Sequence, residues 1–216
     1  LLHAFPDELS GEPGAVMLPR ELRDLLDRLR SSRPSIAGVP AVPVRVVASA
    51  GTACRAAAAA ARSHGLQARL VRARIDGDAA ELGVRFVASL ARQSEGVVQV
   101  RGGESTVSLP AQPGRGGRNQ HLALAAALEL ERRGLQDAHL LAAGTDGIDG
   151  SSSDAGALVD VETCQRGRDA GCDPTDSLAR ADSGTFLEAA GDLLHTGPTL
   201  TNVGDLVLGL RLGGRG

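Results

Sequence analysis

The sequence predicts an α/β fold in which a βαβ unit is followed by a smaller α/β domain with a mixed sheet. In the first part, short valine-rich runs alternate with longer runs at helical spacing, which is typical of parallel βαβ units. From residue 97 the apolar runs become shorter and glycine-rich loops separate them. This change predicts a boundary between two domains, residues 1–95 and 96–216.

The elements expected before the boundary begin with an amphipathic helix at 19–30, which starts at a proline and carries leucines on one face. A Pro/Gly/Ser-rich connection follows. The remaining pattern predicts strands at 44–50 and 66–76, and helices at 51–65 and 78–93.

The elements expected after the boundary are shorter. Two strand-like runs at 97–103 and 105–109 flank a Gly-Gly-Glu turn and predict a hairpin or a strand–loop–strand. A helix at about 119–133, a strand at 138–143 and a short strand at 157–163 follow. Weaker helical patterns lie near 161–170 and 184–194, and a polar turn from residue 195 leads into an apolar strand.

Composition excludes several classes of function. The net charge of −3 shows no electrostatic footprint for nucleic acid, and no apolar run approaches the roughly 20 residues of a membrane helix. All 23 basic side chains are arginine, so chemistry that needs a lysine amine cannot come from this sequence. The three scattered cysteines and the acidic N-terminus without a signal peptide predict a cytoplasmic protein with free thiols.

The first candidate site is GRGGRNQ at 114–120, which precedes the helix expected at 119–133. The amides of Gly116 and Gly117 can approach an anion closely, and the helix N-terminus adds partial positive charge. Arg118 can hold a phosphate or a carboxylate through two parallel hydrogen bonds. The alternative is a plain turn, capped by Asn119, with a solvated arginine.

The second candidate site is GTDGIDG at 144–150, directly after an apolar strand. Asp146 and Asp149 suit Mg²⁺, which accepts one or two carboxylates together with substrate oxygens. An Asp-Gly turn that needs no metal is the alternative. An EF-hand is excluded, because Ile148 and Ala157 stand where that motif requires ligands.

Two further loops carry polar side chains with similar alternatives. Glu104, between glycines and hydroxyls, could orient a nucleotide or a metal-bound water, or could be an exposed acid in a turn. Thr199 and Asn202, in HTGPTLTNVGD at 195–205, offer donors for phosphate or polyol oxygens, or could cap a turn. His195 fits a surface or structural histidine better than a base, because no nucleophile elbow accompanies it.

In this order the four motifs resemble the C-terminal half of type-II glycerate kinases, and the region from about residue 97 resembles their MOFRL domain. The family's GGRNQE, AAGTDGIDG and TGPTGTNVND correspond here to GGRNQH, AAGTDGIDG and TGPTLTNVGD. The departures place His121 where the family has an acid, Leu200 where it has a glycine and Gly204 where it has an asparagine. Leucine at 200 should strain that turn, because glycine tolerates backbone angles that leucine avoids.

The resemblance implies phosphorylation of glycerate at its 2-hydroxyl by ATP with Mg²⁺. Arg118, Asp146 and Glu104 would be catalytic, and Asp146 with Asp149 would hold the metal. The substrate or phosphate would contact residues in the two glycine-flanked loops: Gly116, Gly117, Asn119, Thr199 and Asn202. Residues 1–95 would be the end of the family's larger N-terminal lobe, whose catalytic lysine this sequence lacks.

The missing lysine, together with the absence of a starting methionine, predicts that the chain is a fragment with little activity alone. Two other functions stay open: an NAD(P)H-dependent hydroxypyruvate reductase and a non-catalytic ligand-binding fragment. The reductase would need a dinucleotide fingerprint, and no GxGxxG with a downstream acid is present. Glycerate is the expected partner, and a homodimer is an open possibility.

Overall fold

The computed structural model describes residues 20, 24–25, 27–28 and 45–213. The chain divides into two compact units, Leu1–Arg45 and Val46–Gly216, and the fold given below is that of the second unit. Most of the helix expected at 19–30 lies outside the described residues; its five described positions are helical and exposed. The connection expected after it lies outside them as well.

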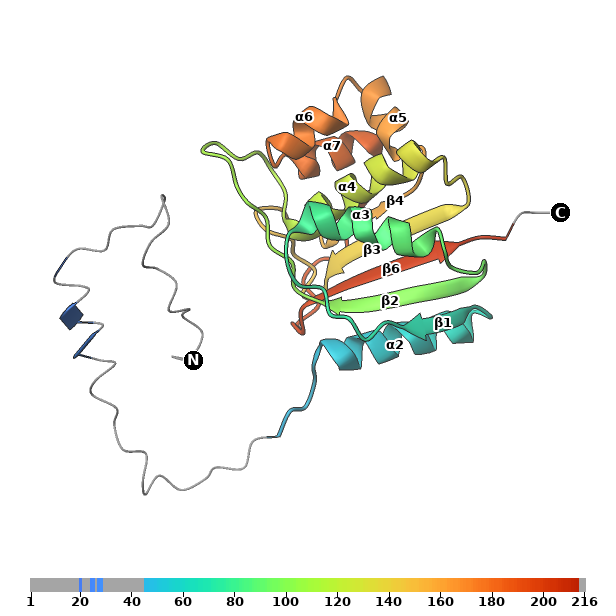
Figure 1. Ribbon diagram of the computed structural model, residues 1–216, viewed down its shortest axis with the longest axis horizontal. Helices are drawn as coiled ribbons and strands as arrows, with labels where there is room; N and C mark the ends of the chain where they lie inside the picture. Colours follow the sequence, from blue (N-terminus) through green and yellow to red (C-terminus); the bar gives the residue numbers. More distant parts are fainter. Residues whose placement is uncertain (1–19, 21–23, 26, 29–44, 214–216) are drawn as a thin grey trace. The chain divides into compact units, whose positions relative to one another are not determined.

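A six-stranded mixed sheet organises this unit, with strand order β1-β2-β6-β3-β4-β5 (Figure 1). β1 (Gln67–Leu70) and β2 (Val97–Gly103) are parallel and α3 (Ala79–Leu90) joins them in a βαβ unit, whose second strand was expected to belong to the second domain. β6 (Asp205–Arg211) runs antiparallel to both β2 and β3 (Ala138–Gly144). β4 (Gly156–Val159) and the two-residue β5 (Leu193–Leu194) complete the sheet by antiparallel pairing. The predicted α/β class with a mixed sheet is therefore confirmed.

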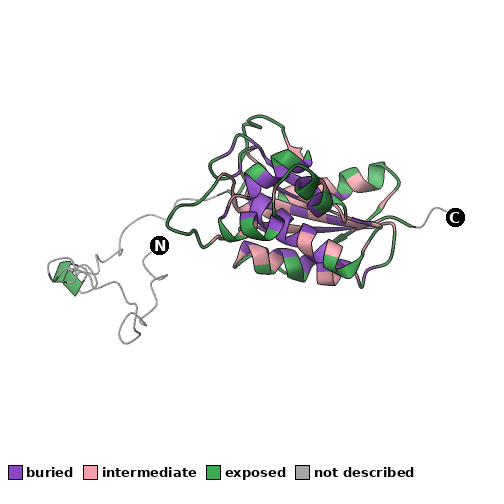
Figure 2. Ribbon diagram, turned by 90° about the horizontal axis from the view of Figure 1, so that it is seen from above, coloured by how far each residue is buried: buried purple, intermediate pink, exposed green. Residues whose placement is uncertain are grey.

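The helices cover both faces of the sheet. α3 and α4 (Arg118–Arg133) pack on one face, and α2 (Ala50–Ser63) packs against β1, β2 and β6 on the other (Figure 1). β6 shows the alternation that this requires: Val207 belongs to the main core beneath α3 and α4, whereas Leu208 contacts the smaller cluster under α2. Buried residues gather between helices and sheet, and the outer helix surfaces are exposed (Figure 2).

Three short helices pack together beside α4, and they complete the core at the β4 end of the sheet (Figure 1). They are α5 (Thr163–Asp169), α6 (Pro174–Ala179) and α7 (Ser183–Ala190). α5 and α7 lie within the helical patterns expected near 161–170 and 184–194, and α6 was not expected. Asp173 begins α6 by accepting a hydrogen bond from the backbone N–H of Asp176. No helix in the described part of the chain is long and apolar enough to span a membrane.

Two predicted strands are wrong. Residues 45–49 form no strand, and Val46 and Val47 are 75% and 85% exposed, because no described strand pairs with them. Residues 105–109 form no hairpin with β2, since β6 occupies that edge and only Thr106 makes an isolated bridge, to Asp78. The boundary expected between residues 95 and 96 stays a prediction, although β1 and β2 share one sheet across it.

α3 and α4 approach each other closely at Gly83. A Cβ at this position would lie 2.5 Å from the backbone oxygen of Leu122 and 3.1 Å from the nitrogen of Ala126. Both contacts are with backbone atoms of α4, so no side chain can rotate to make room. Gly83 therefore sets the spacing between the two helices that carry the core.

We expect Gly83→Ala to lower the free energy of unfolding by about 1–3 kcal/mol, because the added methyl group must push α4 away. Gly51→Ala, in the first turn of α2, is the matched control, because its Cβ would make only ordinary contacts at 3.6 Å. The control should be neutral or slightly stabilising. Urea unfolding of both variants measures the difference, and equal stabilities would contradict the close packing.

Candidate functional site

The N-terminus of α4 holds the carboxylate of Asp149. Asp149 Oδ1 accepts hydrogen bonds from the backbone N and from Nδ2 of Asn119, both at 3.1 Å, and Oδ2 accepts from the backbone N of Gln120 at 2.8 Å. Asp149 is only 1% exposed. Burial raises the pKa of its carboxyl group, while the hydrogen bonds from Gln120 and Asn119 act in the opposite direction. The anion expected at this helix terminus is therefore the chain's own carboxylate.

The glycines of 114–117 let the two motif loops pack against each other. A Cβ on Gly117 would lie 2.5 Å from Asp149 Oδ1, and one on Gly150 would lie 2.4 Å from the oxygen of Gly116. The backbone N of Gly116 donates to Ser151 Oγ at 3.3 Å. Gly116 and Gly117 therefore allow the glycine loop to pack against the acidic loop. Their expected role as a phosphate cradle stays a prediction, and this geometry does not favour it.

Arg118 forms a bidentate ion pair with Asp205, the first residue of β6. Nε lies 2.6 Å from Oδ2 and Nη2 lies 2.9 Å from Oδ1, with Asp205 1% exposed. Nη2 also lies 3.4 Å from Oε1 of the exposed Glu104. The hydrogen bonds that Arg118 donates to Asp205 raise the pKa of its guanidinium, which burial alone would lower. Nη1 donates to no described residue, so one edge of the guanidinium is available to a ligand.

Sequence reasoning placed Asp205 in the terminal polar loop but not among the site residues. Asn119 Nδ2 donates to Asp205 Oδ1 at 3.1 Å as well as to Asp149, so one amide links the two buried carboxylates. Asp205 stands where a polar turn becomes an apolar strand, and that position is the sequence feature that could have identified it. A carboxylate at that point lies at the end of the sheet, beside the helix that begins at Arg118.

Asp146 is joined to the terminal loop. Its Oδ2 accepts from Asn202 Nδ2 at 3.1 Å, and its Oδ1 accepts from the backbone N of Ile148 at 3.1 Å. The backbone N of Thr199 donates to the oxygen of Asp146 at 3.1 Å, and Thr145 donates from both N and Oγ1 to Gly204. The structure thus brings Asp146, Thr199 and Asn202 together, as the sequence motifs suggested.

The Asp146 corner adjoins the Arg118 corner at Gly144. The Cβ position of Gly144 lies 3.0 Å from Asp146 Oδ1 and 3.7 Å from Asn119 Nδ2, and Gly144 pairs with Asp205 across the β3–β6 ladder. Asn119 Oδ1 is buried without a hydrogen-bond partner. Residues from α4, the acidic loop and β6 therefore pack closely around Gly144, where a Cβ would also lie 2.8 Å from the backbone oxygen of Ile148.

No group of three or more His, Cys, Asp and Glu side chains in the described part of the chain is arranged to hold a metal ion. Asp149 is a poor candidate for a ligand, because both of its oxygens already accept hydrogen bonds from α4. Asp146 is better placed. It is half-buried, and each of its oxygens accepts a single hydrogen bond. A metal here would depend on one carboxylate, on water and on ligand oxygens.

A second polar cluster surrounds Asp154, and no sequence motif indicated it. His195 Nδ1 lies 2.7 Å from Oδ1 of Asp154, and Arg115 Nη2 lies 3.6 Å from Oδ2. Asp154 is buried, whereas the side chain of His195 is 70% exposed. His195 is thus on the surface, as expected, but a buried carboxylate holds its ring. Arg115 also donates from its backbone N to Asp182 at 2.9 Å, which ties the glycine loop to α7.

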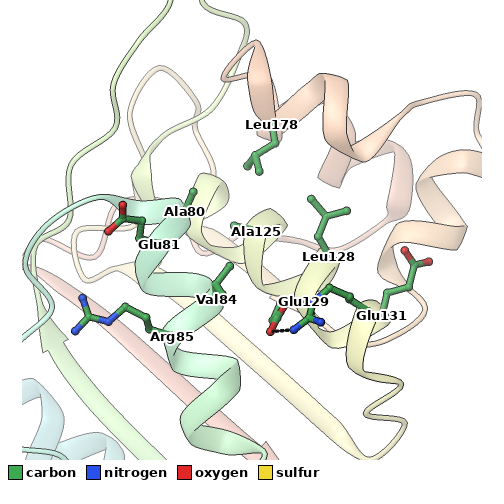
Figure 3. Close-up of a pocket in the computed structure, with 10 residues that line it drawn as sticks. Ala80, Glu81, Val84, Arg85, Ala125, Leu128, Glu129, Glu131 and Leu178 are labelled. Atoms are coloured by element: carbon green, nitrogen blue, oxygen red, sulfur yellow. Dashed lines mark hydrogen bonds and ion pairs between the residues drawn. The ribbon is translucent and has the colours of Figure 1, made fainter.

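A wide groove lies away from these residues. It has a volume of about 780 Å³ and lies between α3 and α4, with Leu178 of α6 at one side (Figure 3). Val84, Leu128 and Leu178 give it an apolar lining, while Arg85 extends away from it (Figure 3). None of the predicted site residues lines this groove.

Comparison with known proteins identifies the family. The profile of the MOFRL family matches residues 97–205, which is half of the chain. The chain belongs to the MOFRL family. This match begins with β2 and ends at Asp205, so it contains every residue of the cluster around Gly144.

The MOFRL relatives are mostly named as glycerate kinases. D-glycerate 2-kinase from Thermotoga maritima is 39% identical over 165 residues, which are 73% of this chain and 39% of that protein. The crystal structure of glycerate kinase from the same organism superposes with a TM-score of 0.75 at 35% identity, covering 79% of this chain and 42% of that one. A relative from Agrobacterium vitis, 44% identical over 75% of this chain and 38% of its own length, has hydroxypyruvate reductase as a provisional name. The chain spans about two fifths of the length of these relatives.

Leu200 shows the strain that its position predicted. Its φ is +62°, in the left-handed region, and it is 98% exposed. A left-handed conformation costs an L-residue about 1–2 kcal/mol, and no buried contact of the side chain offsets this. The neighbouring loop residues nevertheless keep the hydrogen bonds that join them to Asp146.

Asp205→Asn should lower the free energy of unfolding by about 2–4 kcal/mol, because it leaves the Arg118 guanidinium without its buried counter-charge. Glu104→Gln is the matched control: it removes the other acid beside Arg118, but that side chain is 68% exposed. The control should change stability by less than about 0.5 kcal/mol. Chemical denaturation measures both, and a loss in the control as large as in Asp205→Asn would refute the assignment.

Leu200→Gly should raise the free energy of unfolding by about 0.5–1 kcal/mol, which is the left-handed strain relieved less the backbone entropy that glycine loses. Leu109→Gly, at an exposed leucine without positive φ, should be neutral or destabilising. Thermal unfolding of both variants measures the contrast. A lower midpoint for Leu200→Gly than for the parent protein would show that the leucine makes a stabilising contact.

Proposed function

We propose that this chain forms one wall of the active site of a glycerate 2-kinase, which transfers a phosphoryl group from ATP to the 2-hydroxyl of glycerate with Mg²⁺. The names of the relatives support the reaction class. The observation that carries the proposal is the geometry around Gly144, which the Asp146 carboxylate contacts and which pairs across the sheet with Asp205, the partner of Arg118. A fixed cation next to an acid is what positioning and charge neutralisation in phosphoryl transfer require.

Arg118 would bind the carboxylate of glycerate or a phosphate oxygen. Its Nε and Nη2 atoms are held by Asp205, so the guanidinium plane is fixed before a ligand arrives. The free Nη1 edge can donate two hydrogen bonds. Glu104, exposed beside Nη2, would limit how closely a second anion approaches.

Asp146 would hold Mg²⁺, with Asn119 as a partner for metal-bound water. The residues fit this ion: Asp146 offers a half-buried carboxylate, and Asn119 Oδ1 is a buried acceptor that lacks a donor. Bound there, Mg²⁺ would neutralise charge on the transferring phosphoryl group. Asn202 keeps the Asp146 carboxylate in place, and the hydroxyl groups of the terminal loop lie at its side.

Asp149 has a supporting role in this proposal. Its carboxylate fastens the acidic loop to α4 and so fixes the distance between Asp146 and Asn119. The reductase alternative places a pyrophosphate at a helix N-terminus, as dinucleotide-binding folds do. At α4 that position is already occupied by a carboxylate, which would repel a pyrophosphate, so we favour the kinase.

The remaining wall of the site would come from residues outside this sequence. The relatives are more than twice as long as the matched region. This chain contains no lysine, so a lysine contact to a phosphate would have to come from elsewhere. We therefore propose that the 216-residue chain alone has weak activity or none. The product of the whole gene would carry the activity.

The test is a coupled assay of ADP release with D-glycerate and Mg·ATP, on this chain and on the product of the whole gene. In the longer protein, Asp146→Asn should lower kcat by at least about 100-fold, because the metal loses its carboxylate. Its thermal midpoint should stay close to that of the parent protein. Asp169→Asn, an exposed acid on α5, is the matched control and should keep full activity.

Three outcomes would count against the proposal in different ways. Equal kcat values for Asp146→Asn and the control would remove Asp146 from the site. Turnover of hydroxypyruvate with NADH, with none of glycerate with ATP, would establish the reductase instead. Glycerate binding by calorimetry without turnover under either condition would leave a non-catalytic binding domain.

A further inference from the structure

Four arginines gather on the α3 side of the sheet edge formed by β1. Arg69 belongs to β1 and Arg101 to β2, while Arg85 lies on α3 and Arg92 lies just after it. Within the described part of the chain, none of the four has a carboxylate within ion-pair distance. We call these residues the edge arginines.

The edge arginines are held in position by a polar network. Arg69 Nη2 donates to Gln93 Oε1 at 3.2 Å, and Arg101 Nη2 donates to Ser89 Oγ at 3.3 Å. Gln99 joins these two contacts, because its Nε2 lies 3.1 Å from both Ser89 Oγ and Gln93 Oε1. Gln99 pairs directly with Arg69 in the β1–β2 register. The cluster is therefore built into the sheet rather than scattered over a surface.

Two buried polar atoms of this network have no hydrogen-bond partner: Gln99 Oε1 and Arg101 Nε. Gln99 is 0% exposed. The guanidinium of Arg101 lies over the ring of Phe86, 5.0 Å from its centroid. Burial lowers the pKa of the Arg101 guanidinium, and the like charges of Arg69 and Arg85 lower it further. An anion would offset this repulsion, since an unpaired and half-buried charge is costly.

A groove of about 340 Å³ opens beside two of the edge arginines, Arg69 and Arg92. It is lined by residues at the start of β1 and at the turn between α3 and β2: Gln67, Ala68, Arg69, Arg92, Gln93, Ser94 and Val97. The nearby Glu95 pairs with Arg211 at 3.7 Å, and Glu81 lines the larger groove of α3 and α4. The side chain of Arg85 extends away from that larger groove (Figure 3). The lining thus offers arginine and amide groups and no acid.

We propose that the edge arginines and this groove bind a compact phosphate-bearing anion. Planar guanidinium groups recognise phosphate through paired hydrogen bonds, and several of them suit a chain of phosphates better than a single carboxylate. The groove lies at the start of β2, whereas Glu104 and Asp205 lie at its end, about 20 Å along a seven-residue strand. It is therefore separate from the site around Gly144 and does not rest on the kinase proposal.

The test is isothermal titration calorimetry of the 216-residue chain with tripolyphosphate and, separately, with ATP, both without Mg²⁺. Arg69→Gln with Arg92→Gln should weaken tripolyphosphate binding at least about tenfold, because two phosphate contacts are lost. Arg55→Gln with Arg180→Gln removes the same charge at two positions, on α2 and directly after α6, that do not line the groove, and should change the affinity less than about twofold. Arg69→Lys, which keeps the charge but loses the planar fork, should give an intermediate affinity.

The two ligands distinguish the source of the phosphate. Equal affinities support recognition of the phosphate chain alone, and tighter binding of ATP with the same loss in the double variant supports a nucleotide ligand. The proposal is overturned if neither ligand binds, or if the two double variants lose affinity equally.

Discussion

The arrangement of the site depends on one buried carboxylate at the beginning of one helix. Asp149 accepts three hydrogen bonds from the first turn of α4, and through them it fixes the loop that carries Asp146. The same turn presents Arg118 and Asn119, so the cation, the amide and the second acid are positioned by a single contact. Replacement of water by backbone N–H groups is what makes a charge tolerable in this buried place.

Arg118 balances the second buried acid. Asp149 and Asp205 both accept hydrogen bonds from the side-chain amide of Asn119, so the two carboxylates lie near each other. The Arg118 guanidinium pairs with only one of them, Asp205. This excess of negative charge, together with the half-buried carboxylate of Asp146, favours a divalent cation over a further anion at the Gly144 corner. Arg118 alone remains as the contact for an anionic ligand, with its unoccupied Nη1 edge. A cation would therefore bind at the Gly144 corner, and an anionic group of the ligand would bind at Arg118.

Much of this architecture follows from local sequence pattern. The alternation of strands and helices, α4 and the two loops with glycine and aspartate were predictable, because periodicity and turn residues act over short distances. The strand expected at 44–50 failed because a valine-rich run needs a partner strand, which the pattern cannot supply. The role of Asp149 was misread for a related reason. A carboxylate beside glycines can bind a metal or accept hydrogen bonds at a helix N-terminus. Only the fold shows that Asp149 contacts Asn119, 30 positions earlier in the chain. Asp205 was missed because its partner lies 87 positions away.

The place of β6 in the sheet has a consequence for how the chain is made. β6 lies between β2 and β3, although it is the latest of these strands in the sequence. While the polypeptide emerges from the ribosome, β2 and β3 each expose an unpaired edge until residues 205–211 have been synthesised. Asp205 arrives with that strand, so the guanidinium of Arg118 also waits for its counter-charge. The β1–β2 and β3–β4 pairs can form earlier, but the complete sheet and the Arg118–Asp205 pair require β6 to have been synthesised.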